Sequence, residues 1–233
     1  MNKKKLKEFW NKEYKDPEFF TLSEKPSADL EKYARWMQKE FGKDVFRPGL
    51  SVLDLGCGNG RNLIYFVDQF KMKGIGYDIS EEAIIQAKKS AEALGFRIQF
   101  HVHSISDPFP IPDESVDLVL DMMSSHFLTE KEREPYFKEV LRVLAPGGFF
   151  LFKSFYIAGD IHAKELIHKH SAGETNAYIH PRLKVYEYVW DDQAIQETFG
   201  PHFDLLHKEA SHRHFNKGKP NKRRSVICYF QKK

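Results

Sequence analysis

Three glycines at alternate positions are the residues of this chain most able to build a ligand site. Gly56, Gly58 and Gly60 follow the apolar run 51–55, and a helical pattern begins at Asn62. A glycine turn between a strand and a helix brings the backbone close to a ligand and points the helix N-terminus at it. We therefore predict a ligand site at this turn.

Two acids and one absent glycine narrow the choice of ligand. The dinucleotide fingerprint G-x-G-x-x-G needs a third glycine where Arg61 stands. Asp54 lies in an otherwise apolar strand, where we expect it to accept hydrogen bonds from the turn's N–H groups and to repel a pyrophosphate. Asp78 ends a second predicted strand, where an acid can bind both ribose hydroxyls. S-adenosylmethionine, a cationic ribose compound without phosphate, fits these residues.

The elements that must position these residues alternate along the chain. We predict strands over residues 51–55, 74–78, 98–103, 116–121, 149–156, 203–210 and 225–231. Helices are expected after Ser80, after the capping-box pair Thr129 and Glu132, and over 191–199. The turn Pro146–Gly148 should precede the fifth strand. This alternation predicts a doubly wound, Rossmann-like α/β sheet that is mostly parallel, with helices on both faces.

The two less regular parts of the chain are its first 47 residues and an insertion at about 157–190. Residues 1–47 are helical in pattern and rich in aromatic side chains, which indicates either core packing or a helical lid over a pocket. We therefore expect a lid segment over 1–47 and a ligand-binding domain over 48–233. The insertion is polar and rich in histidine.

Four motifs in order make the chain resemble the class I S-adenosylmethionine-dependent methyltransferases. They are residues 52–60 (VLDLGCGNG), 76–80 (GYDIS), 111–119 (IPDESVDLV) and 140–148 (VLRVLAPGG). The resemblance covers roughly residues 48–156. It implies a seven-stranded sheet whose last strand is antiparallel, and the two predicted C-terminal strands complete that count.

The resemblance also implies which residues bind the cofactor. Asp54 would lie beneath the turn, Asp78 would hold the ribose hydroxyls and Ile79 would pack on the adenine. The adenine amine would meet Ser104, Ser106, Asp107 or the backbone of Ile105. The methionine part and ribose would lie on Gly56, Cys57, Gly58, Asn59 and Gly60, with Asp121 and Met122 nearby, facing the methionine part and the acceptor.

The expected reaction is a direct displacement in which an acceptor atom attacks the sulfonium methyl group. The protein then has to align the partners and exclude water, and only some acceptors need a base. His126 or Asp121 could be that base, although His126 could equally position its loop. The predicted acceptor contacts are Trp10, Tyr14, Tyr156 and His162, with His180, Tyr186 and Tyr188 as further candidates.

Composition limits the classes of partner. Of 233 residues, 41% are hydrophobic and 30% are charged, and no run suits a membrane span or a signal peptide, so we expect a cytoplasmic protein that is a monomer or homodimer. Two cysteines are too few for a disulfide framework or a zinc cluster. We expect no metal, although His212 and His214 could share one face of a strand.

The acceptor class stays open at this level. A small molecule is the first hypothesis, and RNA or protein is the second. The net charge of only +3 argues against nucleic acid, whereas the basic loop 217–224 could contact phosphate. Two other classes remain, a nicotinamide-dependent oxidoreductase and a cofactor-binding protein without catalysis. Arg61 and Asp54 argue against the oxidoreductase.

Overall fold

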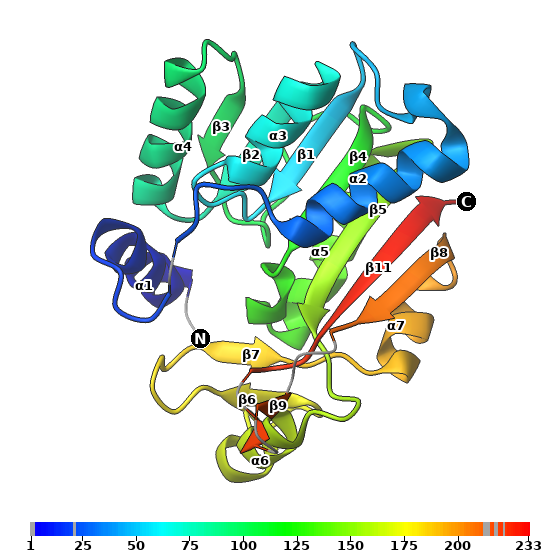
Figure 1. The fold of residues 1–233 in the computed structure, drawn as a ribbon. Helices are drawn as coiled ribbons and strands as arrows, with labels where there is room; N and C mark the ends of the chain where they lie inside the picture. Colours follow the sequence, from blue (N-terminus) through cyan, green and yellow to red (C-terminus); the bar gives the residue numbers. More distant parts are fainter. Residues whose placement is uncertain (1–2, 21, 212–214, 217–218, 221) are drawn as a thin grey trace.

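A seven-stranded sheet runs through the chain in the computed structural model, which describes residues 3–20, 22–211, 215–216, 219–220 and 222–233 (Figure 1). The strand order is β3-β2-β1-β4-β5-β11-β8. β11 runs antiparallel to both of its neighbours, β5 and β8, whereas the other pairs of this sheet are parallel, which confirms the predicted topology. The strands are β1 (Ser51–Leu55), β2 (Lys73–Asp78), β3 (Gln99–Val102), β4 (Val116–Met122), β5 (Leu144–Phe155), β8 (Phe203–Ala210) and β11 (Ser225–Lys232).

Helices cover both faces of the sheet because successive strand residues point to opposite sides. Val52 and Leu118 belong to one buried cluster, with α2 (Ala28–Phe41), α3 (Arg61–Phe70) and α4 (Glu81–Ala93). Their neighbours Leu53 and Val119 belong to the other cluster, with α5 (Glu130–Val143) and α7 (Asp192–Phe199). The sheet is therefore buried on both faces, as the apolar strand sequences indicate.

Local sequence signals account for several element boundaries. Ser80 caps α4 by accepting a hydrogen bond from Ala83 N, and Thr129 with Glu132 forms the predicted capping box of α5. The predicted turn at 146–148 lies inside the extended strand β5. Its register jumps from Leu144, opposite Val116, to Phe149, opposite Leu118, so residues 145–148 leave the regular ladder.

The two irregular parts of the chain meet at the carboxyl edge of the parallel strands (Figure 1). Helix α1 (Lys3–Lys15) stands off this edge, and the insertion adds α6 (Ile161–His170) and a hairpin of β6 (Ala177–Ile179) and β7 (Tyr186–Tyr188) below it. Helix α2 instead packs on the sheet through Leu30, Tyr33 and Met37. Of the predicted lid, only the part before α2 therefore covers the ligand edge.

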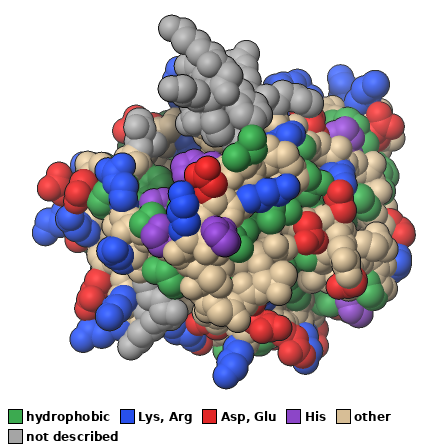
Figure 2. Space-filling model, turned by 90° about the horizontal axis from the view of Figure 1, so that it is seen from below, with side chains coloured by type: hydrophobic (Ala, Val, Ile, Leu, Met, Phe, Trp, Pro, Cys, Tyr) green, Lys and Arg blue, Asp and Glu red, His purple; other side chains and the backbone are tan. Residues whose placement is uncertain are grey.

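Short elements complete the described part of the chain. The 3-10 helices are η1 (Lys43–Val45) and η2 (Ser125–Phe127), and β9 (Phe215–Asn216) pairs with β10 (Lys219–Pro220). Figure 2, viewed from below Figure 1, shows histidine side chains among lysines and arginines. Among the described residues, no helix is long and apolar enough to cross a membrane.

Candidate active site

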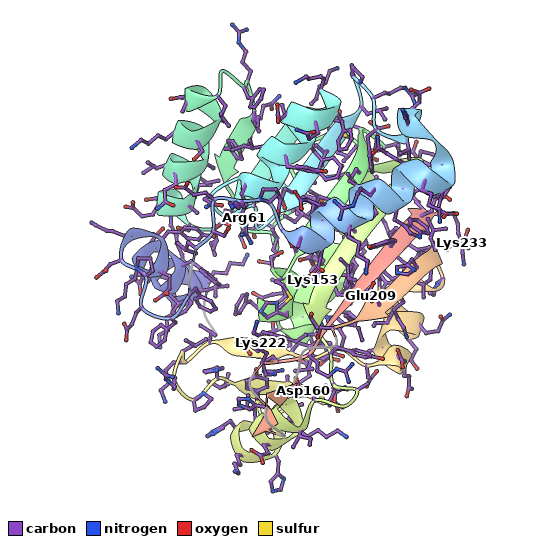
Figure 3. All side chains as sticks on the ribbon, in the orientation of Figure 1. Arg61, Lys153, Asp160, Glu209, Lys222 and Lys233 are labelled. Carbon is purple, nitrogen blue, oxygen red and sulfur yellow. The ribbon has the colours of Figure 1, made fainter. Side chains whose placement is uncertain are left out.

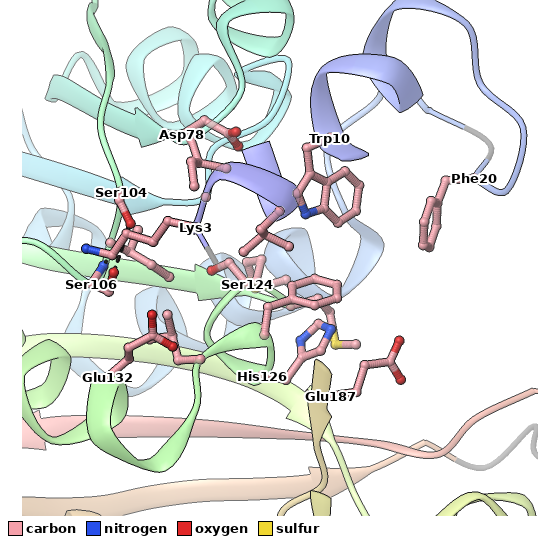
Figure 4. A pocket seen from close by; sticks show the side chains of 18 of the residues that line it. Lys3, Trp10, Phe20, Asp78, Ser104, Ser106, Ser124, His126, Glu132 and Glu187 are labelled. Atoms are coloured by element: carbon pink, nitrogen blue, oxygen red, sulfur yellow. Dashed lines mark hydrogen bonds between the residues drawn. The ribbon is translucent and has the colours of Figure 1, made fainter. Parts of the chain in front are cut away.

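A cavity of about 320 Å³ opens at the carboxyl edge of the sheet, beneath α1 (Figure 4). Open α/β sheets bind their ligands at this edge, where the strand order reverses between β1 and β4. The cavity wall comes from the glycine turn, from the segments that follow β2, β3 and β4, from α1 with its following loop, and from β5 and β7.

The glycine turn has the backbone conformation that its sequence predicts. Gly56 and Gly58 have φ angles of 74° and 56°, which favour glycine. A Cβ atom on Gly56 would overlap Ser124, and one on Gly58 would overlap the Tyr14 hydroxyl. Of the turn's glycines, Gly56 directly lines the cavity. The side chain of Arg61, at the foot of α3 (Figure 3), donates to the carbonyl of Lys25 at 3.1 Å.

Asp54 does not have the hydrogen bonds that the sequence predicts for it. The N–H groups of Gly56 and Cys57 donate to the Tyr77 carbonyl, and that of Gly58 donates to Asp78. Asp54 is 1% exposed, and its Oδ2 has no hydrogen-bond partner among the described residues. Burial, followed by the charges of Asp121 and Asp78, raises the pKa of Asp54 to about 8. In the ligand-free chain this carboxyl is therefore largely protonated near neutral pH, and it would not repel a pyrophosphate there as the sequence predicts.

Asp78 is placed to accept further hydrogen bonds. Its Oδ2 accepts from Gly58 N at 2.9 Å and its Oδ1 accepts from Ser80 N at 2.8 Å, so each oxygen keeps acceptor capacity toward the cavity. Burial raises the pKa of this carboxyl to about 6, against the lowering effect of the two N–H groups. A vicinal diol with two donors matches this arrangement.

One end of the cavity joins Asp78 to the segment after β3. Ile79, Ser104, Ile105 and Ser106 all line it, and the Ser104 and Ser106 hydroxyls are 3.0 Å apart. Figure 4 shows both serines on the same side of the cavity as Lys3. Asp107, the alternative adenine contact, does not line the cavity and pairs instead with the Lys3 ammonium.

Helix α1 is fixed over this end by polar contacts with α4. The Ser80 hydroxyl donates to Asn11 Oδ1 at 2.8 Å, and Gln86 Nε2 donates to the carbonyl of Tyr14 at 2.6 Å. Trp10 and Tyr14 line the cavity. The rings of α1 therefore border the cavity, and the role of this helix as a lid stays a prediction.

The loop that follows α1 depends on a buried acid. Glu13 is fully buried, and its Oε2 accepts from the backbone N–H groups of Glu18, Phe19 and Phe20 at 3.0–3.3 Å. These bonds hold the loop in a shape that places Phe20 in the cavity wall. No local sequence pattern indicates this role, because Glu13 resembles the other charged residues of an exposed helix.

The opposite end of the cavity is an aromatic compartment, which consists of Trp10, Phe20, Phe127 and Phe155. The Trp10 ring lies 5.2 Å from that of Phe20 and 5.5 Å from that of Phe127. Four separate segments supply these rings, two from the lid part and two from the sheet domain. Glu187, which is 3% exposed, enters the wall of the same compartment (Figure 4).

His126 lies in this compartment as an electrically neutral side chain. It is 3% exposed, its ring lies 4.0 Å from Phe127 and 4.7 Å from Phe155, and its Nδ1 has no partner among the described residues. Burial, with a smaller effect from Arg223, lowers the pKa of His126 to about 3. Such an imidazole can accept a hydrogen bond at neutral pH but is a weak base.

Asp121, the other predicted base, faces away from the cavity. Its Oδ1 accepts from Ser124 N, Ser124 Oγ and Ser125 N, and its Oδ2 accepts from the Tyr136 hydroxyl at 2.8 Å. These bonds fix the loop after β4 and leave the carboxylate fully buried. The structure therefore favours a loop-positioning role for Asp121, whereas Met122 does line the cavity.

Two of the predicted acceptor contacts lie elsewhere. Tyr156 is in the core, and its hydroxyl donates to Asp192 at 2.7 Å because the side chain faces α7. His162 is exposed on α6. On β7, Tyr186 and Tyr188 face Arg133, and neither lines the cavity.

Glu187 is a polar residue of the cavity wall that the sequence did not indicate. Neighbouring strand residues point to opposite sides, so the residue between Tyr186 and Tyr188 faces the cavity. His180 is not in the cavity wall either. The strand alternation was the available signal, but the sequence does not show which face of β7 meets the site.

The described residues provide no group of metal ligands and only part of the basic loop. Within the described ranges, no three His, Cys, Asp or Glu side chains are grouped as metal ligands. His212 and His214 lie outside these ranges, as do residues 217, 218 and 221 of the basic loop. In the part of this loop that is described, the Arg223 guanidinium turns toward Asp160, which accepts from Arg223 Nε and from the backbone N–H of Arg224.

Comparison with known sequences decides the family. A family profile described as "Methyltransferase domain" matches residues 52–148, which hold the glycine turn, Asp78 and the segment after β3. Residues 52–148 therefore form a domain of the class I S-adenosylmethionine-dependent methyltransferase type. S-adenosylmethionine is accordingly the methyl donor, and the contacts of the glycine turn and Asp78 with it stay predictions.

One curated relative is the fatty-acid O-methyltransferase of Mycolicibacterium smegmatis. It is 28% identical over 127 residues, which are 54% of this chain and 44% of that enzyme. The chain spans less than half the length of the first curated relatives that it matches. Because about half of each chain lies outside this match, the acceptor does not follow from it.

Solved structures support the fold over nearly the whole chain. The Burkholderia thailandensis 1,6-didemethyltoxoflavin-N1-methyltransferase, with its bound acceptor and S-adenosylhomocysteine, superposes with a TM-score of 0.71 at 18% identity. That alignment covers 98% of this chain and 88% of the other. The [4+2]-cyclase SpnF also superposes, with a TM-score of 0.60 at 18% identity over 87% of this chain and 80% of the other. The fold alone therefore does not specify methyl transfer.

Proposed function

We propose that this chain transfers the methyl group of S-adenosylmethionine to a small molecule bound in the aromatic compartment. The observation that carries the proposal is the cavity itself. It has a diol-binding acid and two serines at one end, and four aromatic rings with His126 and Glu187 at the other. α1 and its loop border both ends, which suits a reaction that must exclude water.

The cofactor half would work through the following contacts. Asp78 accepts the two ribose hydroxyls, Ile79 packs on the adenine, and Ser104, Ser106 or the backbone of Ile105 meets the adenine amine. The methionine part lies against Gly56 and the rest of the turn, 57–60, and points toward Met122. The sulfonium charge would favour the ionised form of the buried Asp54, so binding of S-adenosylmethionine should lower the pKa of that carboxyl.

The acceptor half would align the attacking atom with the methyl carbon. Direct displacement needs no covalent intermediate on the protein, so placement supplies most of the rate. His126 accepts a hydrogen bond from the acceptor and fixes its orientation, because its low pKa makes it a poor proton acceptor. Trp10 and Tyr14 join the site from the lid, which links acceptor binding to closure of α1.

A small acceptor is favoured over RNA or protein by the position of this compartment. The reacting end lies among Phe20, Phe127 and Phe155, under the loop that Glu13 holds, which suits an acceptor small enough to fit beneath that loop. In the described part of the basic loop, the Arg223 guanidinium is directed toward Asp160. Similar proteins point the same way, since one is a fatty-acid O-methyltransferase and another is a 1,6-didemethyltoxoflavin-N1-methyltransferase.

The test is a transfer assay with methyl-labelled S-adenosylmethionine on three separated pools: a metabolite extract, total RNA and total protein. We expect label in the metabolite pool only. Label in the RNA or protein pool alone would refute the small-molecule proposal. A parallel titration calorimetry experiment with S-adenosylhomocysteine and NAD tests the site, and binding of NAD without S-adenosylhomocysteine would refute the cofactor assignment.

A further inference from the structure

The acid Glu187 is the most informative polar group of the acceptor compartment. It is 3% exposed, lies in the cavity wall and points into a space otherwise bordered by aromatic rings (Figure 4). A buried carboxylate is unfavourable unless other groups compensate its charge. The identity of those groups decides whether the compartment favours an anionic, a neutral or a cationic acceptor.

The protein compensates Glu187 only in part. The Tyr178 hydroxyl donates to its Oε2, and Arg223 Nη1 lies 3.5 Å from the same oxygen. The Arg223 guanidinium is shared, because its Nε donates to Asp160 Oδ2 at 3.1 Å. Asp160 is fully buried as well, so the Arg223 guanidinium is divided between Glu187 and a second buried carboxylate.

The cavity meets the carboxylate of this cluster and not its cation. Glu187 is among the lining residues, whereas Arg223 lies behind the wall, with its guanidinium 4.5 Å from the centre of the Phe155 ring. Burial raises the pKa of Glu187, with Tyr178 and Arg223 acting in the opposite direction. An acceptor therefore meets a negative or hydrogen-bond-accepting surface at this end.

The surrounding rings favour the same kind of guest. Aromatic faces attract cations, and a ring of them beside a carboxylate suits an amine or a nitrogen heterocycle. Trp10, Phe20, Phe127 and Phe155 provide such faces within one compartment. A carboxylate acceptor beside Glu187 would be repelled. The two cationic residues of the cavity wall have other partners, since Lys3 pairs with Asp107 and Arg61 donates to the carbonyl of Lys25.

We propose that the acceptor is a small amine or nitrogen heterocycle, methylated on nitrogen, with an N–H group that donates to Glu187. This inference rests on the proposed methyltransferase function. An amine that binds as its cation first passes one proton to the Glu187 carboxylate, which frees the nitrogen lone pair. This lone pair forms the new N–C bond while the S–C bond pair goes to sulfur, which leaves as neutral S-adenosylhomocysteine. The positive charge thus passes from sulfur to the acceptor nitrogen, where the aromatic rings stabilise it.

The test compares matched pairs of probes that differ only in this charge. They are phenethylamine with 3-phenylpropionate, and tryptamine with indole-3-propionate. Binding is measured by calorimetry on the full chain saturated with S-adenosylhomocysteine, and transfer is measured by mass spectrometry with S-adenosylmethionine. We expect each amine to bind at least tenfold more tightly than its carboxylate and to gain one methyl group. Equal binding, tighter carboxylate binding or no amine binding would overturn the inference.

Two variants assign the preference to named side chains. Glu187→Gln should reduce the amine preference at least tenfold, whereas Glu165→Gln, which removes an exposed acid on α6, should leave it unchanged. An unchanged preference in Glu187→Gln overturns the inference. If that variant does not fold, Phe127→Leu serves instead, and its amine preference should fall severalfold, with no change in preference counting against the inference.

Failure of this inference can be told apart from failure of the proposed function. Loss of S-adenosylhomocysteine binding, or absence of transfer to every pool, would refute the methyltransferase proposal itself. Binding of S-adenosylhomocysteine with transfer only to carboxylates or hydroxyls would keep that proposal and refute the nitrogen acceptor.

Discussion

Replacement of Asp78 by asparagine should weaken cofactor binding more than any other single change of similar size. Asp78→Asn keeps the shape of the side chain but removes its charge, and hence two charge-assisted hydrogen bonds to the ribose hydroxyls. The loss of such bonds costs about 1–3 kcal/mol. That free energy corresponds to an increase of about 5- to 150-fold in the Kd of S-adenosylhomocysteine.

The structure adds a second cost to this substitution. Asp78 accepts from both Gly58 N and Ser80 N, so the amide of asparagine must direct its NH2 group at one of these donors. The glycine turn would then shift, which places the expected loss toward the upper part of the range. Wild-type affinity should also fall as the pH drops below about 6, because protonation of Asp78 removes an acceptor.

The assay is titration calorimetry with S-adenosylhomocysteine at pH 7.5, where Asp78 of the wild type is ionised. Asp44→Asn is the matched control, since it neutralises an exposed acid in η1. This element precedes β1 in the chain, and Asp44 is not part of the cavity wall. A Kd for Asp78→Asn within twofold of the wild type, with the control also unchanged, would refute the assignment of Asp78 to the ribose.

Three further predictions concern single buried groups. Folding raises the pKa of Asp54 from 3.8 to about 8, so the free energy of unfolding of the ligand-free chain should fall as the pH rises from 4 to 8. In denaturant titrations, Asp54→Asn should show a smaller decline over this range. An equal decline in both proteins would contradict the prediction. Glu13→Gln weakens the hydrogen bonds to the loop that carries Phe20, by about 1 kcal/mol, so amide hydrogen exchange in 16–20 should accelerate, with unchanged exchange as the contrary result. Because the pKa of His126 is about 3, its protonation should leave no step in kcat between pH 5 and 8; a step that His126→Asn abolishes would show that it titrates as a base.

The parts of the fold that follow local rules could be predicted from the sequence. The apolar runs of β1 and β4, the capping box at Thr129 and the Ser80 cap all depend on neighbours within a few residues, and the structure confirms them. The topology also followed, because alternating strands and helices allow few arrangements. The insertion gave weaker periodicity, and its helix α6 and short hairpin were not predicted.

The site divides in the same way. The residues that line the cofactor end come from motifs with fixed spacing, so Gly56, Asp78 and the segment 104–106 were placed together correctly in the cavity wall. The partners of Asp54 were wrong because the Tyr77 carbonyl on the neighbouring strand takes two of the turn's N–H groups. Long-range competition of this kind leaves no mark in the local sequence.

The acceptor end was least predictable because its wall comes from segments far apart in the chain. Trp10 was named as a contact, but Phe20, Phe127 and Phe155 read as ordinary core residues until the fold brings them together. Glu187 shows the limit most clearly, since the sequence indicated the two tyrosines beside it and the structure turns the opposite face of β7 to the cavity.

The most direct test of the central claim is a crystal structure of the chain with S-adenosylhomocysteine bound. We expect ribose hydroxyls within hydrogen-bond distance of the Asp78 carboxylate, and adenine beside Ile79 and residues 104–106. We expect the sulfur atom to be directed at the compartment that holds Phe127 and Glu187. Adenine in the aromatic compartment, or a ribose without contact to Asp78, would contradict it.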